Sequence, residues 1–287
     1  MDRRTFIAGY IGVGAVTGIS RDAVAQAPGS TGKPGGLLLG TVTYNLARAW
    51  DVDTIIKNCK ETGFTGIELR TTHAHGVEIT LPADKRQEVR RRFADSPVKL
   101  VGLGTTCEYH AADPAVVKKN IEETKAWFML AKDIGAGGVK VRPNGLSAGV
   151  PEEKTLEQIG LALKECAAFG ADHGIPLRLE IHGRETARFP RIKKIMQHAE
   201  HPNFFLCWNC NGEDLQDGGI KTNFDIVKNR IGLVHLKDLY EAYPYREFFA
   251  MLRGIDYKGY CLAEIPESSD PVRLMKYYRA LFEAQQV

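Results

Sequence analysis

The sequence predicts a single-domain α/β protein of the (β/α)8 TIM barrel class, and three observations lead to this prediction. Eight short apolar runs recur between residues 36 and 265. The segments between them are mostly long enough for a crossover helix, and several repeat their apolar residues with a helical period. The chain has 287 residues, and about 250 suffice for one such barrel. We therefore assign residues 37–287 to one barrel and expect no second domain.

The eight apolar runs are the expected strands, and longer segments separate them. The runs are GLLLGTVTYN at 36–45, TGIELR at 65–70, VKLVGLG at 98–104, GGVKVRPN at 137–144, IPLRLEIH at 175–182, FFLCWN at 204–209, IGLVHLKD at 231–238 and GYCLAEI at 259–265. Such continuous apolar character is typical of parallel strands buried on both faces. Residues 113–134 and 151–173 show the i, i+3, i+4 spacing of amphipathic helices. The segment 185–203 fits less well, because Pro190 falls where the fifth helix should begin.

A closed barrel is favoured over an open, doubly wound sheet. An open sheet of this kind usually carries a glycine-rich phosphate-binding turn after its first strand. The sequence contains neither a GxGxxG nor a Walker pattern.

Composition limits the class of protein and of partner. Hydrophobic residues make up 44% of the chain and charged residues 25%, which excludes a disordered or collagen-like chain. The net charge of +3 is too weak to indicate nucleic acid or an anionic membrane as the main partner, so we expect a neutral substrate. Six cysteines in a chain of this length do not indicate a disulfide framework. The sequence leaves open whether the chain forms a homo-oligomer.

The first 25 residues are expected to be an export signal of the twin-arginine type. Arg3 and Arg4 precede a modestly apolar stretch at 7–19, and Ala23-Val24-Ala25 has the small-residue pattern of a processing site. The apolar stretch is too short to span a bilayer, which takes about 20 residues. We therefore expect a periplasmic or secreted protein with no stable membrane anchor after processing, in which residues 26–36 form a flexible leader.

Four polar residues close four consecutive apolar runs and are the strongest candidates for a site. They are Glu180, Asn209, His235 and Glu264, separated by 29, 26 and 29 residues. Each interval is one strand-helix unit, so the side chains should converge at the C-terminal end of the barrel, where such barrels carry their active sites. Two buried carboxylates without a counter-charge would be costly. A divalent cation with mixed oxygen and nitrogen ligands removes that cost.

Further polar residues at or near the ends of the predicted strands are candidates for substrate binding. Residues two apart on a strand share a face, which places His182 beside Glu180 and Lys237 beside His235. The full set of substrate-binding candidates is His182, Lys237, Arg142, Lys140, Glu68, Glu108, His110 and Tyr44. Tyr44 offers an apolar wall for a sugar ring. The formal CxxC at Cys207 to Cys210 is not interpreted as a redox pair, because its cysteines would point to opposite faces of a strand.

The motifs LEIHG, CWN, VHLKD and AE, together with GIELR, resemble those of the xylose isomerase-like barrels, a family that includes sugar epimerases and dehydratases. The resemblance runs from about residue 37 to the C-terminus. It implies that Glu180, Asn209, His235 and Glu264 hold one divalent metal ion, which could be Mn, Mg, Co or Zn. Asn209 departs from the family pattern, which has Asp there, and so lowers the ligand charge by one.

This resemblance implies proton abstraction next to a carbonyl through an enediolate, with Glu180 and Glu264 as catalytic base and conjugate acid. We expect a metal-dependent sugar isomerase or epimerase. A 3-oxo-glycoside lyase or hydratase that shares the first step is the second possibility. A noncatalytic sugar-binding barrel is a weaker alternative. An AP-endonuclease-like zinc phosphodiesterase is also weaker, because the residues that pattern requires are replaced around Lys140 and at Gly212.

Overall fold

The computed structural model describes residues 36–287, which form eight strands and eight α-helices in alternation. The strands are β1 (Leu38–Val42), β2 (Gly66–Arg70), β3 (Lys99–Gly104), β4 (Val139–Val141), β5 (Leu177–Glu180), β6 (Phe204–Trp208), β7 (Ile231–Leu236) and β8 (Tyr260–Ala263). The helices are α1 (Val52–Thr62), α2 (Ala83–Ala94), α3 (Pro114–Ile134), α4 (Glu152–Asp172), α5 (Phe189–His198), α6 (Gly219–Val227), α7 (Tyr245–Gly254) and α8 (Pro271–Gln285). Short 3-10 turns are η1 (Gly212–Leu215) and η2 (Lys228–Arg230). The predicted export signal, and the leader up to residue 35, lie outside the described residues.

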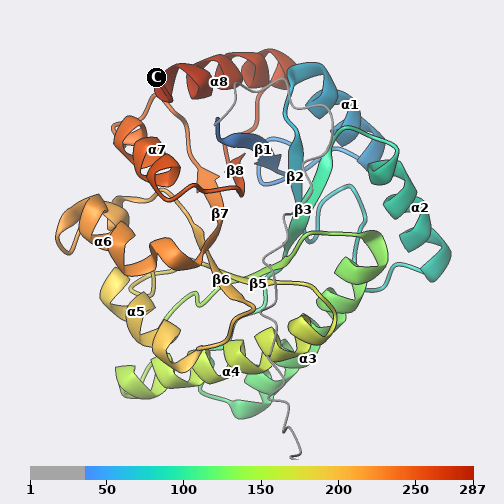
Figure 1. Cartoon of the computed structure of the whole chain (residues 1–287). Coiled ribbons are helices and arrows are strands. Elements are labelled where there is room, and N and C mark those ends of the chain that lie inside the picture. The colour runs from blue at the N-terminus through green and yellow to red at the C-terminus, as the bar shows by residue number, and fades with distance from the viewer. Residues whose placement is uncertain (1–35) are drawn as a thin grey trace, which may run out of the picture. The chain divides into compact units, whose positions relative to one another are not determined.

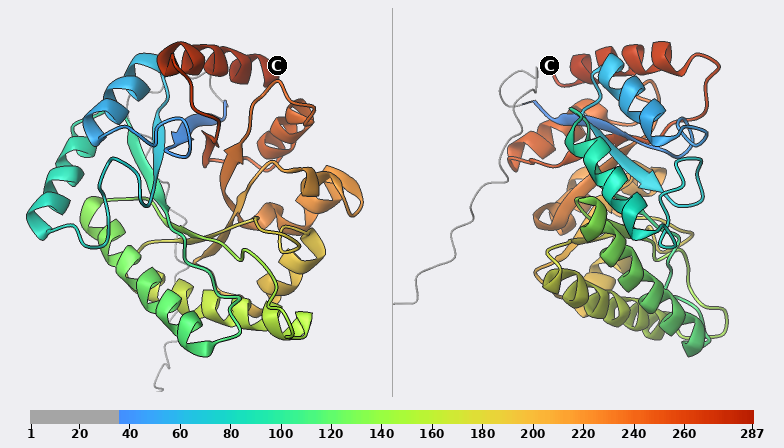
Figure 2. Two further views of the ribbon diagram at one scale, coloured as in Figure 1. Left: turned by 180° about the vertical axis from the view of Figure 1, so that it is seen from behind. Right: turned by 90° about the vertical axis from the view of Figure 1, so that its right-hand side faces the viewer.

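The strands form a closed parallel barrel in the order β1 to β8, and β8 pairs with β1. Helices surround the strands when the barrel is viewed along its axis (Figure 1), and two further views show them outside the strands from other sides (Figure 2). The predicted (β/α)8 TIM barrel is therefore confirmed. All eight predicted strands are present, each shorter by one to five residues than the apolar run that predicted it.

Local sequence signals explain where the helices begin and end. The side chain of Asp51 accepts a hydrogen bond from the Thr54 amide at the start of α1, and Asp113 caps α3 in the same way. Gly63 ends α1 in the left-handed conformation that glycine adopts without strain. Pro190 lies in the first turn of α5, where a missing backbone N–H costs nothing. The proline that fitted poorly in the sequence therefore marks the start of the fifth helix.

The core lies between the strands and the helices, and an aromatic cluster anchors it around β6. Trp208 is fully buried and packs against Phe189, Phe224 and Phe248 at ring-centroid distances of 4.9–6.0 Å. Such aromatic pairs each add about 0.5–1.5 kcal/mol beyond their buried area. Trp208 therefore serves to pack the core on the helix side of β6. All six cysteines are buried and free, so no disulfide framework is present.

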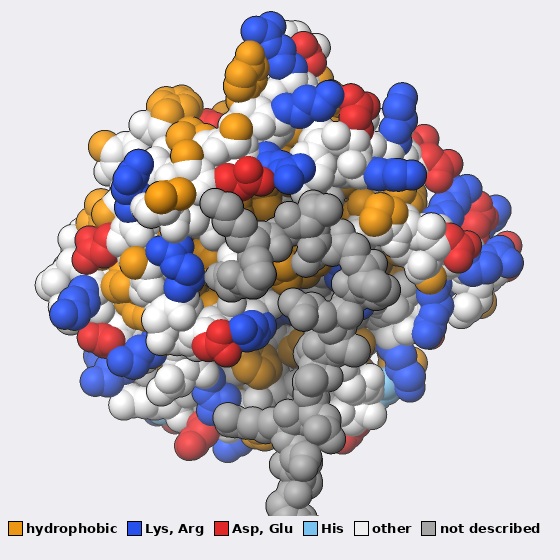
Figure 3. Space-filling view, turned by 45° about the horizontal axis from the view of Figure 1, so that its top comes forward, with side chains coloured by type: hydrophobic (Ala, Val, Ile, Leu, Met, Phe, Trp, Pro, Cys, Tyr) orange, Lys and Arg blue, Asp and Glu red, His pale blue; other side chains and the backbone are white. Residues whose placement is uncertain are grey.

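The surface of the described barrel shows no concentration of one sign of charge on the face in Figure 3, where basic and acidic side chains are interspersed outside the grey atoms. Among residues 36–287, no helix combines the length and apolarity that a membrane crossing requires.

Candidate metal centre

The C-terminal ends of β5 to β8 bring together the residues with the regular sequence spacing. Glu180 is the last residue of β5, His235 is the fifth residue of β7, and Asn209 and Glu264 directly follow β6 and β8. Glu180, His235 and Glu264 each offer one ligand atom, and these atoms lie within 4.8 Å of one another. The parallel register of neighbouring strands explains this convergence, since it keeps their ends at similar heights.

The donor set fits a divalent cation. His235 is fully buried, and neither of its ring nitrogens has a hydrogen-bond partner among the described residues. Its Nδ1 lies 3.8 Å from Oε1 of Glu180 and 3.8 Å from Oε1 of Glu264. Two ligands bound to one ion at about 2.1 Å each can be up to about 4.2 Å apart. These three side chains could therefore hold one ion between them.

Two lysines hold the other carboxylate oxygens of the same glutamates. The Lys140 ammonium contacts Oε2 of Glu180, and the Lys237 ammonium contacts Oε2 of Glu264. Burial alone would raise the pKa of Glu180, but Lys140 and His235 outweigh it and lower the pKa. Burial would likewise lower the pKa of Lys140, but Glu180 and Glu68 raise it. Glu180 therefore stays ionised. Each glutamate has one oxygen towards His235 and the other on an ammonium.

Asn209 bridges this arrangement through both atoms of its amide. Its Nδ2 donates to Oε1 of Glu180 at 2.9 Å, and its Oδ1 accepts from Lys237 at 3.0 Å. The reverse amide orientation would place oxygen against carboxylate and N–H against ammonium. The partners therefore fix the amide, and the predicted ligand oxygen is held by Lys237 in this structure.

Asn209→Asp is expected to raise the affinity for a divalent cation by about tenfold or more, because hard cations favour a charged oxygen over a neutral one. Without metal, the new carboxylate would lie beside Glu180, so the variant should melt at a lower temperature than the wild type. Asn209→Leu, which offers no oxygen, should bind metal more weakly than either. Calorimetric titration with Co²⁺ measures the three affinities. Equal affinities would place Asn209 outside the coordination sphere.

Glu68 and Lys140, two of the predicted substrate-binding residues, are both buried. Glu68 is fully buried, and its Oε1 is 3.4 Å from Nε2 of His235, on the ring edge opposite Nδ1. Lys140 is also buried and reaches both Glu180 and Glu68. Their contact with substrate stays a prediction. Lys237, whose side chain is 27% exposed, is the candidate lysine nearer solvent.

Four other predicted residues form a second polar cluster over β3, β4 and β5. Glu108 accepts hydrogen bonds from Arg142 at 2.8 Å and from Asn144 at 2.7 Å. Nδ1 of His182 lies 3.0 Å from the Asn144 side-chain oxygen, and Nδ1 of His110 lies 3.8 Å from Glu108. The sequence analysis did not assign Asn144, which links Glu108 to His182. Its backbone lies in the left-handed region (φ 59°), which is uncommon outside glycine.

Tyr44 lies apart from both clusters, in the loop that follows β1. The residue is 41% exposed, its ring stacks with that of His73, and the Arg70 guanidinium lies 5.4 Å from the ring centroid. Burial, together with nearby Arg70, His75 and Arg48, lowers the pKa of His73 to about 4. At neutral pH this edge of the barrel therefore presents an exposed tyrosine beside an uncharged imidazole.

The structure also reveals a buried acid that the sequence analysis did not single out. Asp214 in η1 is fully buried, and one of its oxygens accepts from the Tyr243 hydroxyl at 2.7 Å and from the Asn211 amide at 2.9 Å. Its other oxygen has no partner among the described residues. Burial raises the pKa of Asp214 to about 7. No apolar pattern surrounds this residue in the sequence, so nothing there predicted its burial.

Asp214 should make the stability of the barrel depend on pH. Its pKa is higher in the folded state than in the unfolded chain, so between about pH 4 and pH 7 the folded state binds more protons and stability falls as pH rises. Asp214→Asn should remove this loss and be more stable than the wild type at pH 8, by up to about 4 kcal/mol. The difference should fall to about 1 kcal/mol at pH 4.5. Urea unfolding of both proteins at the two pH values measures it, and a pH-independent difference would contradict the assignment.

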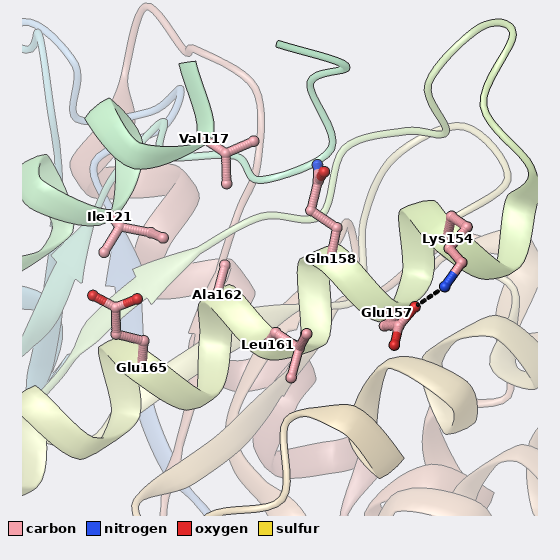
Figure 4. A pocket seen from close by; sticks show the side chains of 8 residues that line it. All are labelled: Val117, Ile121, Lys154, Glu157, Gln158, Leu161, Ala162 and Glu165. Carbon is pink, nitrogen blue, oxygen red and sulfur yellow. Dashed lines mark hydrogen bonds and ion pairs between the residues drawn. The ribbon is translucent and has the colours of Figure 1, made fainter. Parts of the chain in front are cut away.

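A surface groove lies between α3 and α4, away from all of these residues. It is lined by Val117, Ile121, Lys154, Glu157, Gln158, Leu161, Ala162 and Glu165 (Figure 4). The groove belongs to the outer helical layer, whereas barrels of this class place their chemistry at the C-terminal ends of the strands. It is therefore not the candidate active site.

The chain is similar to known proteins in sequence and in fold. The chain is 23% identical over 217 residues to an L-ribulose 3-epimerase of Methylomonas sp. (strain DH-1), covering 71% of this chain and 74% of that one. The solved structure of 3-keto-D-glucoside 4-epimerase from E. coli has a TM-score of 0.73 at 12% identity, covering 86% and 99% of the two chains.

A further solved structure shows the fold with a metal. The IOLI protein with a bound zinc atom has a TM-score of 0.71 at 15% identity, covering 88% of this chain and 97% of that one. The family model described as xylose isomerase-like TIM barrel matches residues 56–284, which is most of the barrel. The chain belongs to the xylose isomerase-like TIM barrel family.

Proposed function

We propose that the protein is a divalent-metal-dependent sugar isomerase or epimerase that removes a proton next to a carbonyl group. The observation that carries this proposal is the position of His235 Nδ1, 3.8 Å from one oxygen of Glu180 and from one oxygen of Glu264 at the C-terminal end of the barrel. The similarity to an L-ribulose 3-epimerase supports a sugar as substrate. The zinc-containing relative supports the metal.

Glu180, His235 and Glu264 would hold the ion, with Asn209 beside them. A divalent ion there supplies Lewis-acid stabilisation of the negative charge that develops on oxygen when the proton is removed. Glu264 is the better placed of the two glutamates to take that proton. Its side chain is 13% exposed, against 4% for the side chain of Glu180. The lysine that contacts Glu264, Lys237, is also more exposed than Lys140, which contacts Glu180.

The fate of the proton decides the reaction. Its return to the opposite face of the same carbon gives an epimer, and its return to the neighbouring carbon gives an isomer. Loss of a substituent from the next carbon would instead make the protein a lyase. The similarity to a 3-keto-D-glucoside 4-epimerase favours testing 3-oxo-glycosides alongside free ketoses.

NMR in deuterated water tests the proposal, since all of these outcomes share the first proton transfer. The metal-loaded protein should exchange one carbon-bound hydrogen for deuterium in L-ribulose, D-allulose or a methyl 3-oxo-glucoside. Glu264→Gln is the matched control for exchange catalysed by buffer or free metal. Binding of these sugars without exchange in any of them would indicate a noncatalytic sugar-binding barrel instead.

We also propose that the N-terminal twin arginines direct export to the periplasm or medium. The support is the order of charge, apolar stretch and small residues over residues 1–25. Changing Arg3 and Arg4 together to Lys should leave unprocessed protein in the cytoplasm, measured by fractionation and the mass of the N-terminal peptide. Processed protein outside the membrane at wild-type levels would show that this interpretation of the signal is wrong.

A further inference from the structure

We infer that Glu68 is a positioning residue of the metal centre: its carboxylate, behind His235, fixes the ring so that Nδ1 faces Glu180 and Glu264. This inference rests on the proposed function, because it assigns to Glu68 a role toward the metal that the function requires. Glu68 is not one of the three residues whose ligand atoms cluster at the centre. It would act through His235 and not on the ion.

The burial of Glu68 is the first observation. The residue is fully buried, and neither of its carboxylate oxygens has a hydrogen-bond partner among the described residues. A buried charge without such partners is costly, so the position calls for a reason other than packing. The nearest imidazole atom is Nε2 of His235, 3.4 Å from Oε1 of Glu68. Metal-binding histidines usually direct the ring nitrogen that does not bind the metal at a carboxylate or carbonyl.

The two ring nitrogens of His235 thus face two different sets of acids. Among the carboxylates of the centre, Nε2 faces Glu68, whereas Nδ1 faces Glu180 and Glu264. A proton held on Nε2 by Glu68 leaves the Nδ1 lone pair free for a metal ion. Cys207 also lies close to His235, but a thiol is only a weak hydrogen-bond acceptor, so the carboxylate of Glu68 is the group that selects this tautomer.

Two features of β2 and β3 make room for the Glu68 carboxylate and direct it. A side-chain carbon at Gly104 on β3 would lie 2.8 Å from Oε1 of Glu68, so only glycine leaves this space open. The register between β2 and β3 shifts between Ile67 and Glu68, and the shift sets Glu68 opposite Gly102. Register shifts of this kind are frequent next to active sites, where they re-aim a side chain.

Glu68 also reaches a second part of the centre. Its Oε1 lies 3.5 Å from the Lys140 ammonium, which contacts the Oε2 of Glu180. One carboxylate on β2 therefore supports His235 directly and Glu180 through Lys140. If Glu68 served only as a counter-charge for Lys140, its removal would lower stability but would leave the His235 tautomer unchanged.

Co²⁺ binding to the purified full-length protein, followed by calorimetry and by the absorption of the bound ion, tests the inference. Glu68→Leu should weaken Co²⁺ binding by about 10- to 100-fold. Glu68→Gln should weaken it less, since the amide oxygen can still accept from Nε2–H. Gly104→Ala should also weaken binding, because it displaces the carboxylate without removing it. Gly102→Ala is the matched control, since its new methyl group would meet Arg178 and not Glu68.

A second measurement separates positioning from stability. In Zn²⁺-loaded protein with ¹⁵N-labelled histidine, long-range ¹H–¹⁵N correlation should show His235 protonated on Nε2 in the wild type and in Glu68→Gln, and this pattern should be lost in Glu68→Leu. Unchanged Co²⁺ affinity in a folded Glu68→Leu protein, or a proton on Nδ1 in the wild type, would overturn the inference. If Glu68→Leu does not fold, Glu68→Gln and Gly104→Ala decide by the same two readouts.

The two proposals fail in different ways. A wild type that binds Co²⁺ with Glu68-dependent affinity but exchanges no hydrogen in any sugar would refute the proposed function and leave Glu68 as a positioning residue. An active wild type whose metal affinity is the same in folded Glu68→Leu would refute only the role of Glu68.

Discussion

His235→Ala is expected to leave a folded barrel that retains less than about a tenth of the wild-type metal and has no measurable deuterium exchange. The substitution removes the only nitrogen ligand among Glu180, His235 and Glu264. The two remaining glutamates each already have one oxygen in contact with a lysine. Elemental analysis of the purified variant measures the metal, and circular dichroism confirms the fold.

His198→Ala is the matched control, because this histidine ends α5 in the outer helical layer. It should keep full metal content and activity. A His235→Ala protein with the wild-type content of divalent ion would show that the assignment of the metal centre to these strands is wrong.

Glu264→Gln should reduce the rate of deuterium exchange by about 10²- to 10⁴-fold while the protein keeps much of its metal, because the amide oxygen can still bind an ion but cannot take a proton. For Glu180→Gln, the main expected effect is instead a loss of bound metal. Lys140 lowers the pKa of Glu180, so this carboxylate is a poor base but a good ligand. Exchange rates and metal content, measured on both variants, separate the two roles.

The opposite pattern is equally informative. If Glu264→Gln exchanged at nearly the wild-type rate while metal-loaded Glu180→Gln did not, Glu180 would be the base and Glu264 mainly a ligand. The assignment to Glu264 would then be wrong, although the metal centre itself would stand.

The sequence contained enough to predict the barrel and the four-strand spacing, and the reason is physical. Parallel strands covered on both faces need continuous apolar residues, so runs such as 204–209 and 231–238 are visible without any structure. The regular spacing from Glu180 to Glu264 then follows, because each strand and the helix after it take up a similar number of residues. Strand ends were less predictable, because the apolar runs continue into the loops, as at 36–45.

Contacts across the barrel were not predictable by the same reasoning. Glu68 and His235 lie on β2 and β7, which are not neighbours, and spacing along the chain says nothing about which side chains meet in the centre. Their meeting depends on the space at Gly104 and on a register shift, neither of which leaves a pattern. The burial of Asp214 depends in the same way on Tyr243, which comes from a loop 29 residues further along.

The pairing of β1 with β8 has a consequence for how the protein is made. Leu38 of β1 is aligned with Tyr260 of β8. The partner of β1 on this side is therefore synthesised more than two hundred residues after β1 itself. Until then β1 has an unpaired edge, which can pair with other chains. The metal centre is also incomplete until that moment, since Glu264 directly follows β8. A site that uses Glu180, His235 and Glu264 together can therefore form only after β8 has joined the barrel.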